Sequence, residues 1–165
     1  FFCSNILLGQ VIQYTDISSN AGVDNVGLNG GIAFGDYDND GDVDLFFTSV
    51  RGGNVLWRND GKGRFHDITA RSGLNYSGHS SGATFFDFDN DGWPDIYVGA
   101  SDYPGNHGLL YRQTAPGVFS EVSIMDGIDH NRSHGVVAAD FDRDGDLDLL
   151  VVEPGGARLF VLRGG

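Results

Sequence analysis

Three acidic loops contain the residues of this 165-residue chain that are best suited to chemistry. Each loop has the pattern D-x-D-x-D-G-x-x-D, so carboxylates recur at every second position and one more follows the glycine. Alternate side chains of a tightly turned loop point at one centre, which predicts a set of metal ligands. These carboxylates are Asp36, Asp38, Asp40 and Asp44; Asp87, Asp89, Asp91 and Asp95; and Asp140, Asp142, Asp144 and Asp148.

A glycine and a backbone carbonyl complete each predicted ligand set. Gly41, Gly92 and Gly145 follow the third Asp, where a sharp bend favours a residue that adopts positive φ without steric cost. The seventh position would supply a carbonyl ligand. Its residues are Asp42, Trp93 and Asp146. Such an oxygen-rich set favours Ca²⁺, since Mg²⁺ keeps more water and Zn²⁺ prefers His or Cys. The sequence therefore predicts three Ca²⁺ sites.

Two other kinds of loop contain similar residues. An EF-hand needs a bidentate Glu at position twelve, where this chain has Phe47, Val98 and Val151, so the loops are not EF-hands. Asp and Gly are also common in ordinary turns, which would explain a single loop. Three loops at one spacing favour the metal-binding interpretation.

The loops belong to an internal repeat. They start at residues 36, 87 and 140, which gives a period of 51 to 53 residues. An aromatic-x-acid-aliphatic motif recurs with this period, and so does a Leu-aromatic-Arg motif. The copies of the first motif are 14–17, 65–68 and 119–122, and those of the second are 56–58, 110–112 and, more loosely, 161–163. Three repeat units therefore fill the chain.

Each unit is predicted to consist of short strands. Apolar runs rich in β-branched and aromatic residues precede and follow every acidic loop. These runs are 31–35, 82–86 and 135–139 before the loops, and 43–47, 96–98 and 147–152 after them. The Gly-rich stretch 59–63 indicates a hairpin turn. About four short strands per unit predict an all-β fold made of β-propeller-type blades.

On these motifs, the units resemble FG-GAP repeats, the calcium-loop blades of integrin α-subunit propellers. The resemblance covers roughly residues 10 to 163. It implies a propeller with structural Ca²⁺, an extracellular or cell-surface location, and a role in adhesion or recognition of protein or glycan ligands. Such propellers usually have about seven blades, whereas this chain has three units.

Charge and composition narrow the function classes. The formal charge of −13 argues against nucleic acids and anionic membranes as partners and favours cations. No apolar run approaches the ~20 residues that a membrane-spanning helix needs. Cys3 is the only cysteine, so the chain has no intramolecular disulfide. No catalytic constellation stands apart from the acidic loops, and we therefore expect a protein that is not an enzyme.

The histidines and aromatic residues that recur between units are predicted to have packing roles. His79 and His134 stand at matching places before a strand, which favours a shared packing role over metal binding. Trp57 and Tyr111 are equivalent strand residues, and we expect them in the blade core rather than in a sugar-binding platform. Two N-x-S tripeptides, at Asn75 and Asn131, permit glycosylation.

The ends of the sequence lead to a prediction about assembly. Residues 1–9 form an apolar strand or anchor, and residues 10–165 form the three-repeat domain. The opening segment lacks Met and a basic region, as a mature or excerpted terminus would. Residues 9–17 match the last strand of a blade and 159–165 the strand before it, so strand exchange through residues 1–17 would make a homo-oligomer or fibre. A carbohydrate-binding or carbohydrate-active domain, and an excerpt of a larger surface protein, are the alternatives.

Overall fold

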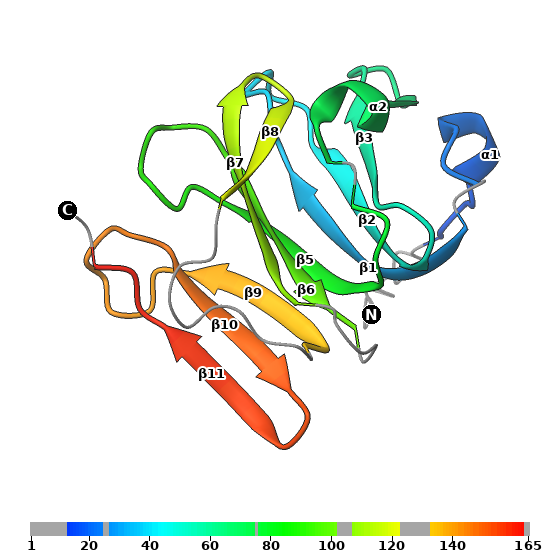
Figure 1. Ribbon diagram of the computed structural model, residues 1–165. Coiled ribbons are helices and arrows are strands. Elements are labelled where there is room, and N and C mark those ends of the chain that lie inside the picture. Colours follow the sequence, from blue (N-terminus) through cyan, green and yellow to red (C-terminus); the bar gives the residue numbers. More distant parts are fainter. Residues whose placement is uncertain (1–12, 25–26, 75, 102–106, 123–132, 164–165) are drawn as a thin grey trace, which may run out of the picture.

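The computed structural model describes residues 13–24, 27–74, 76–101, 107–122 and 133–163. Three antiparallel sheets account for about half of these residues (Figure 1). Two helices of a single turn accompany them, α1 (Ser18–Ala21) and α2 (Thr69–Ser72). The predicted all-β, blade-like fold is confirmed. The predicted N-terminal strand or anchor, residues 1–9, lies outside the described residues.

The first two sheets have four strands each and follow the chain order. Every strand predicted beside the first two acidic loops is present, and so is the hairpin around residues 59–63. The first sheet contains β1 (Leu28–Gly35), β2 (Asp44–Arg51), β3 (Val55–Asn59) and β4 (Phe65–Asp67). The second contains β5 (Ser80–Phe86), β6 (Asp95–Ala100), β7 (Leu109–Ala115) and β8 (Val118–Val122).

The third sheet has three strands in the described part of the chain. Its order is β11-β10-β9, so β10 is central and β11 is at an edge. The strands are β9 (Gly135–Ala139), β10 (Asp148–Glu153) and β11 (Gly156–Phe160). A fourth strand, the counterpart of β4 and β8, does not accompany them among the described residues.

The strand register shows which residues of the three units are equivalent. The matching cross-strand pairs are Leu45 with Trp57, Ile96 with Tyr111, and Leu149 with Phe160. Phe160 is therefore the counterpart of Tyr111. The third copy of the Leu-aromatic-Arg motif is thus 159–161, and the looser match to 161–163 is wrong by two residues. Val161 replaces the arginine of the first two units.

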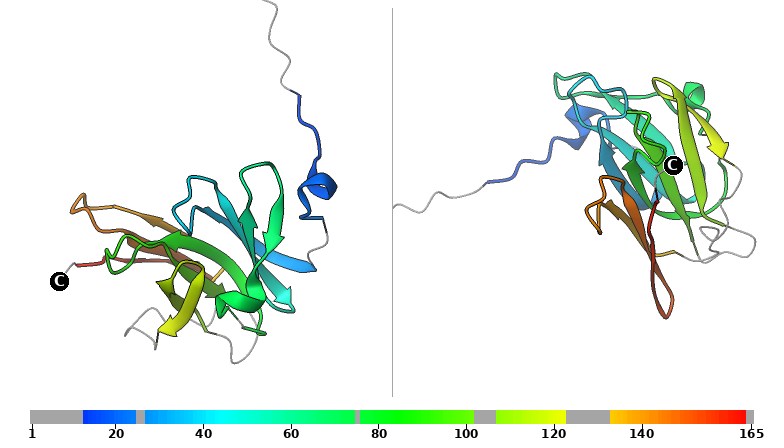
Figure 2. Two further views of the ribbon diagram at one scale, coloured as in Figure 1. Left: turned by 90° about the horizontal axis from the view of Figure 1, so that it is seen from above. Right: turned by 90° about the vertical axis from the view of Figure 1, so that its left-hand side faces the viewer.

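The sheets stand side by side through their first strands. β5 lies between β1 and β9, and the three sheets do not close into a ring (Figures 1 and 2). Glycines permit this close approach. A Cβ on Gly31 would lie 2.6 Å from the Ser81 carbonyl oxygen, and one on Gly82 would lie 3.3 Å from the Gly135 Cα. Bare backbone is therefore required where the inner strands meet.

Apolar side chains fill the spaces between neighbouring sheets. The cluster between the first and second sheets includes Tyr37, Phe46, Leu56, Ile68, Ile96, Tyr111 and Phe119. The cluster between the second and third includes Phe86, Tyr97, Leu110, Leu149 and Val151. Tyr111 is a core residue, as predicted, whereas Trp57 is only half-buried. His79 is half-buried and His134 is exposed, so the two histidines do not share one packing role.

Candidate metal centres

The glycine of each acidic loop adopts the predicted left-handed conformation. φ is 91° at Gly41, 88° at Gly92 and 99° at Gly145. A Cβ at any of the three would meet no atom within 4 Å. Glycine is therefore needed here for its positive φ and not for lack of space.

The fourth residue of each loop also has positive φ, which the sequence analysis missed. φ is 55° at Asn39, 57° at Asn90 and 65° at Arg143. Asn tolerates this region better than other residues with a side chain, so the Asn in D-x-D-N-D-G was the available signal. The third loop has the less suitable Arg143 in the same conformation.

The first Asp of a loop folds the backbone around its carboxylate. Oδ1 of Asp36 accepts a 3.0 Å hydrogen bond from the N–H of Asp40, and its Oδ2 accepts one of 2.9 Å from Gly41. Asp87 makes the same two bonds in the second loop. These bonds hold the turn in shape and keep the carboxylate beside the others.

The last Asp of each loop is buried at the start of the following strand. The exposure of Asp44, Asp95 and Asp148 is at most 1%. Each accepts two backbone N–H groups, one from the second residue of the loop and one from the end of the sheet's third strand or just after it. The donors are Tyr37 and Asn59 for Asp44, Phe88 and Gln113 for Asp95, and Phe141 and Leu162 for Asp148. The loop is thereby joined to the sheet beneath it.

Burial changes the acidity of two of these carboxyls. It raises the pKa of Asp44 and of Asp95 to about 6, although their backbone N–H donors act in the opposite direction. The neighbouring negative charges, such as Asp38 and Asp40 beside Asp44, raise the pKa further. A proton and a cation therefore compete for these groups near neutral pH.

The carboxylates gather closely enough to share one cation. In each loop, three of them place oxygen atoms within 4.8 Å of one another. Oxygens on opposite sides of one Ca²⁺ are about 5 Å apart, so the spacing fits. The three groups are Asp36, Asp38 and Asp40; Asp87, Asp89 and Asp95; and Asp140, Asp142 and Asp148.

The rest of the predicted set lies in the same loops but outside these groups. It comprises the carboxylates of Asp44, Asp91 and Asp144 and the residues at the seventh position, Asp42, Trp93 and Asp146. Oδ1 of Asp38 is buried and has no hydrogen-bond partner in the described structure, and a buried acceptor of this kind is suited to an ion or a water molecule. The donor set of the loops thus suits Ca²⁺.

Arginines pair with the first two loops, which sequence reasoning also missed. Nε of Arg58 lies 2.8 Å from Asp38, and a terminal nitrogen lies 3.0 Å from Asp40. Arg112 pairs with Asp89 and Asp91 in the same way, at 2.6 and 3.0 Å. Both arginines come from the third strand of their sheet. The recurring Leu-aromatic-Arg motif was the signal in the sequence.

Among the described residues, no arginine pairs with the third loop in this way, and Val161 stands at the equivalent position of the third strand. The pKa of Asp142 is raised by desolvation and by the charges of Asp144 and Asp148. In contrast, the N–H of Asp42 and the Arg58 guanidinium lower the pKa of Asp40 in the first loop. Desolvation and like charges therefore act on Asp142 without an arginine pair of the kind that the first two loops have.

Comparison with known families agrees with this geometry. Residues 36–98 and 87–151 each match the FG-GAP-like repeat. These matches cover more than half of the chain, which therefore belongs to the FG-GAP-like repeat family.

Among known proteins, the chain is similar to cartilage acidic protein 1. It is 30% identical to the Xenopus tropicalis protein over 150 residues, or 88% of this chain. It is 29% identical to the mouse protein over 142 residues, or 84% of this chain. The aligned region spans only 22% to 23% of the length of these relatives. No helix in the described residues is long and apolar enough to cross a membrane.

Proposed function

We propose that this chain is a non-catalytic extracellular module in which Ca²⁺ rigidifies three blade loops and whose surfaces serve adhesion and assembly. The observation that carries the proposal is the recurrence of one acidic cluster at the same place in three consecutive sheets. A bound ion would neutralise the clustered carboxylates and fix the loops. The cartilage named in the relatives supports an extracellular location, where Asn75 and Asn131 would be open to glycosylation.

Metal removal tests the role of calcium. Cation binding to the folded state alone stabilises that state by mass action, so chelation should lower the melting temperature clearly. Asp38→Ala should abolish or weaken one of three sites in calorimetry, while Asp24→Ala, an exposed change outside the loops, should leave three. If the chelator leaves the thermal unfolding curve unchanged, calcium has no structural role.

The assembly part of the proposal starts from residues 14–17, which resemble the end of a blade although no other strand of such a blade lies before them among the described residues. Oδ1 of Asp16 accepts the Ser18 N–H at 2.9 Å, as Asp67 accepts the Thr69 N–H at 2.9 Å. A one-turn helix and a glycine with positive φ follow in both places, Gly22 with φ 83° and Gly73 with φ 82°. The segment therefore corresponds to the region from β4 to α2.

Two apolar residues of this segment are exposed in the part of the chain that the structure describes. Ile17 is 56% exposed, whereas its counterpart Ile68 is 6% exposed. Tyr14 is 93% exposed, whereas Phe119, at the same place in β8, is 3% exposed. Residues 13–17 do not form a strand and pair with none of the described strands. They expose apolar surface that a blade would cover.

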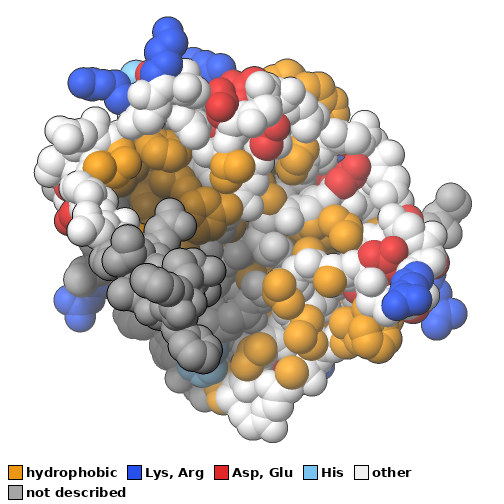
Figure 3. All heavy atoms as spheres, turned by 180° about the vertical axis from the view of Figure 1, so that it is seen from behind, with side chains coloured by type: hydrophobic (Ala, Val, Ile, Leu, Met, Phe, Trp, Pro, Cys, Tyr) orange, Lys and Arg blue, Asp and Glu red, His pale blue; other side chains and the backbone are white. Residues whose placement is uncertain are grey.

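The third sheet has an open position for such a segment beside its edge strand β11. Between the first two sheets, Phe119 packs edge-on against Tyr37 with ring centroids 6.3 Å apart. The counterpart of Tyr37 is Phe88, and beside it lies an apolar cavity of about 480 Å³, also lined by Leu159 and Phe160. Hydrophobic side chains also reach the surface in groups on the face shown in Figure 3, one group lining a hollow. A fourth strand added to β11 would place its aromatic residue in the cavity.

We therefore propose that residues 14–17 of one copy add to β11 of a second copy, with Tyr14 in that cavity. Strand addition of this kind satisfies the open edge of β11 through backbone hydrogen bonds. Light scattering at micromolar concentration should show oligomers that Tyr14→Asp reduces to monomers. Ser19→Asp, an exposed change of the same charge outside the strand, should not. A parent chain that is monomeric at these concentrations would contradict self-assembly.

The carbohydrate-binding or carbohydrate-active alternative stays a hypothesis. Binding of this chain to an array of glycans would favour it over the adhesion module. The aligned region spans less than a quarter of the length of the relatives. The proposal therefore concerns the module formed by these repeats, and the activity and partners of a longer protein that contains it are also proposals.

A further inference from the structure

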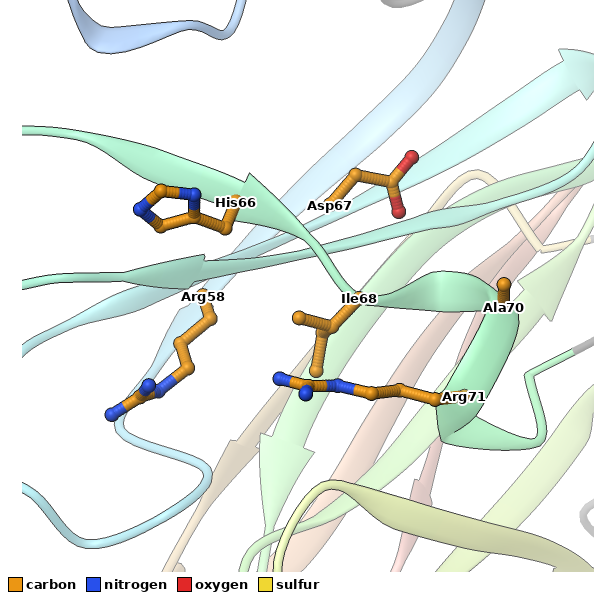
Figure 4. Close-up of a pocket in the computed structure, with 6 residues that line it drawn as sticks. All are labelled: Arg58, His66, Asp67, Ile68, Ala70 and Arg71. Carbon is orange, nitrogen blue, oxygen red and sulfur yellow. The ribbon is translucent and has the colours of Figure 1, made fainter.

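The outer edge of the first sheet is the most basic region of this acidic chain. Four of its ten Lys and Arg residues lie between positions 58 and 71. Two of them, Arg58 from β3 and Arg71 from α2, line a cavity of about 480 Å³ (Figure 4). Cations thus concentrate around one concave site in a chain whose formal charge is −13.

The side chains around this cavity are arranged with the cations together. In Figure 4, Arg58 and Arg71 lie on one side of Ile68, and the Arg71 guanidinium extends toward Arg58. Asp67 lies on the other side of Ile68, and its Oδ1 accepts the Thr69 N–H at 2.9 Å. The carboxylate of the pocket is therefore separated from the two guanidinium groups.

Both guanidinium groups retain hydrogen-bonding capacity. Arg71 has no ion-pair partner in the part of the chain that the structure describes. Arg58 uses Nε and one terminal nitrogen for Asp38 and Asp40, and its other N–H donors are left. A second cavity of about 350 Å³, also lined by Asp38 and Val118, borders the same two arginines and Ile68. Because Asp38 is paired with Arg58, Arg71 is the guanidinium of the site that has no carboxylate partner among the described residues.

We propose that this pocket binds a carboxylate side chain of an acidic peptide segment in a partner protein, and that calcium in the first loop strengthens the binding. The planar guanidinium fork matches a carboxylate. Ala70, which is exposed, and Val118, which is 41% exposed, offer apolar contacts for aliphatic neighbours of that carboxylate. This apolar surface favours a peptide over a sulfated sugar as the occupant.

The link to calcium rests on the proposed function and on one shared residue. Arg58 is paired with Asp38 and Asp40, two of the three clustered carboxylates of the first loop. Ca²⁺ would compete with Arg58 for these carboxylates and cancel their charge. The positive charge of Arg58 would then no longer be balanced by Asp38 and Asp40, and the pocket would attract an anion more strongly.

A peptide titration tests the site. The probe is acetyl-Glu-Leu-Glu-Leu-amide, followed by NMR shifts of the arginine Nε–H groups, with a Gln-Leu-Gln-Leu peptide as its uncharged control. Arg71→Gln should weaken binding about tenfold, while the matched change Arg64→Gln, outside the pocket, should leave it unchanged. Asp67→Asn should tighten binding, because it removes the like charge and keeps the acceptor for the Thr69 N–H.

Three outcomes would overturn parts of the proposal separately. Equal effects of Arg71→Gln and Arg64→Gln would remove the site, and tighter binding of a sulfated disaccharide than of the peptide would remove the peptide partner. Calcium that binds in calorimetry without changing peptide affinity would remove the link to the first loop. Failure of calcium to bind at all would refute the proposed function, yet the comparison of the two arginine variants in calcium-free buffer would still decide the site.

Discussion

The side-chain amide of Asn90 donates a 2.6 Å hydrogen bond to the carboxylate of Asp146, which joins the second acidic loop to the third. The amide of Asn39 likewise donates a 3.1 Å hydrogen bond to the Gly92 carbonyl, joining the first loop to the second. Both asparagines occupy the fourth position of their loop. The left-handed turn of one loop thus supports the next loop along the chain, so order in neighbouring loops is coupled.

We expect Asn90→Ala to destabilise the calcium-free protein by about 1 kcal/mol, because it removes this hydrogen bond and a residue suited to positive φ. In calorimetry, the third loop should also bind calcium more weakly than in the parent. Denaturant unfolding measures the first effect. Asn90→Gly is the matched control for the backbone, since it keeps the turn and loses only the side chain. If the Gly and Ala variants unfold like the parent, the bond does not couple the loops.

The arginines should make the three calcium sites unequal. Arg112 pairs with Asp89 and Asp91 and thus competes with a cation, whereas Val161 leaves the third loop without this competitor. The third loop should therefore fill at the lowest free calcium. Arg112→Gln should raise the affinity of the second loop severalfold, and Val161→Arg should lower that of the third. Weaker calcium binding by Arg112→Gln would mean that Arg112 positions the ligands instead of competing.

The raised pKa values of Asp44 and Asp95 predict a pH dependence. Both groups hold protons more tightly in the folded protein, with pKa about 6, than at their ordinary value of 3.8. The metal-free fold should therefore lose stability as pH rises from about 4 through 6. Calcium binds the ionised groups, so its affinity should fall about tenfold per carboxyl from pH 7 to pH 5.

Unfolding of metal-free protein and calcium titrations at three pH values would check both signs. Asp44→Asn cannot titrate at this position and should reduce the dependence in both measurements. Metal-free stability that increases between pH 4 and pH 6 would contradict the assignment.

The sequence was sufficient to predict the features that recur along the chain. The loop spacing, the flanking strands and the positive φ of Gly41 are local, so pattern and stereochemistry sufficed. The pairing of Arg58 with Asp38 depends on how β3 lies beside the first loop, and the spacing of residues along the sequence does not determine that arrangement. The third copy of the Leu-aromatic-Arg motif was placed two residues late because Arg163 matched better in letters than Val161, and only the strand register decides.

The two glycines that end helices α1 and α2 have the same backbone conformation but different surroundings, so their substitution should have different costs. Gly22 and Gly73 both end a one-turn helix with φ near 80°. A Cβ on Gly22 would lie 3.4 Å from the Phe65 carbonyl oxygen, a normal contact, whereas one on Gly73 would lie 2.3 Å from the Phe119 carbonyl oxygen. That oxygen belongs to the backbone of β8 and cannot move without disturbing the second sheet.

Gly22→Ala should therefore cost about 1 to 2 kcal/mol of stability, the penalty for positive φ alone. Gly73→Ala should cost clearly more, since α2 must also move away from β8 and open the core around Ile68 and Phe119. Denaturant unfolding of the two variants in the same calcium-loaded buffer gives the difference directly. Equal losses would mean that α2 does not pack against β8 as closely as the structure places it.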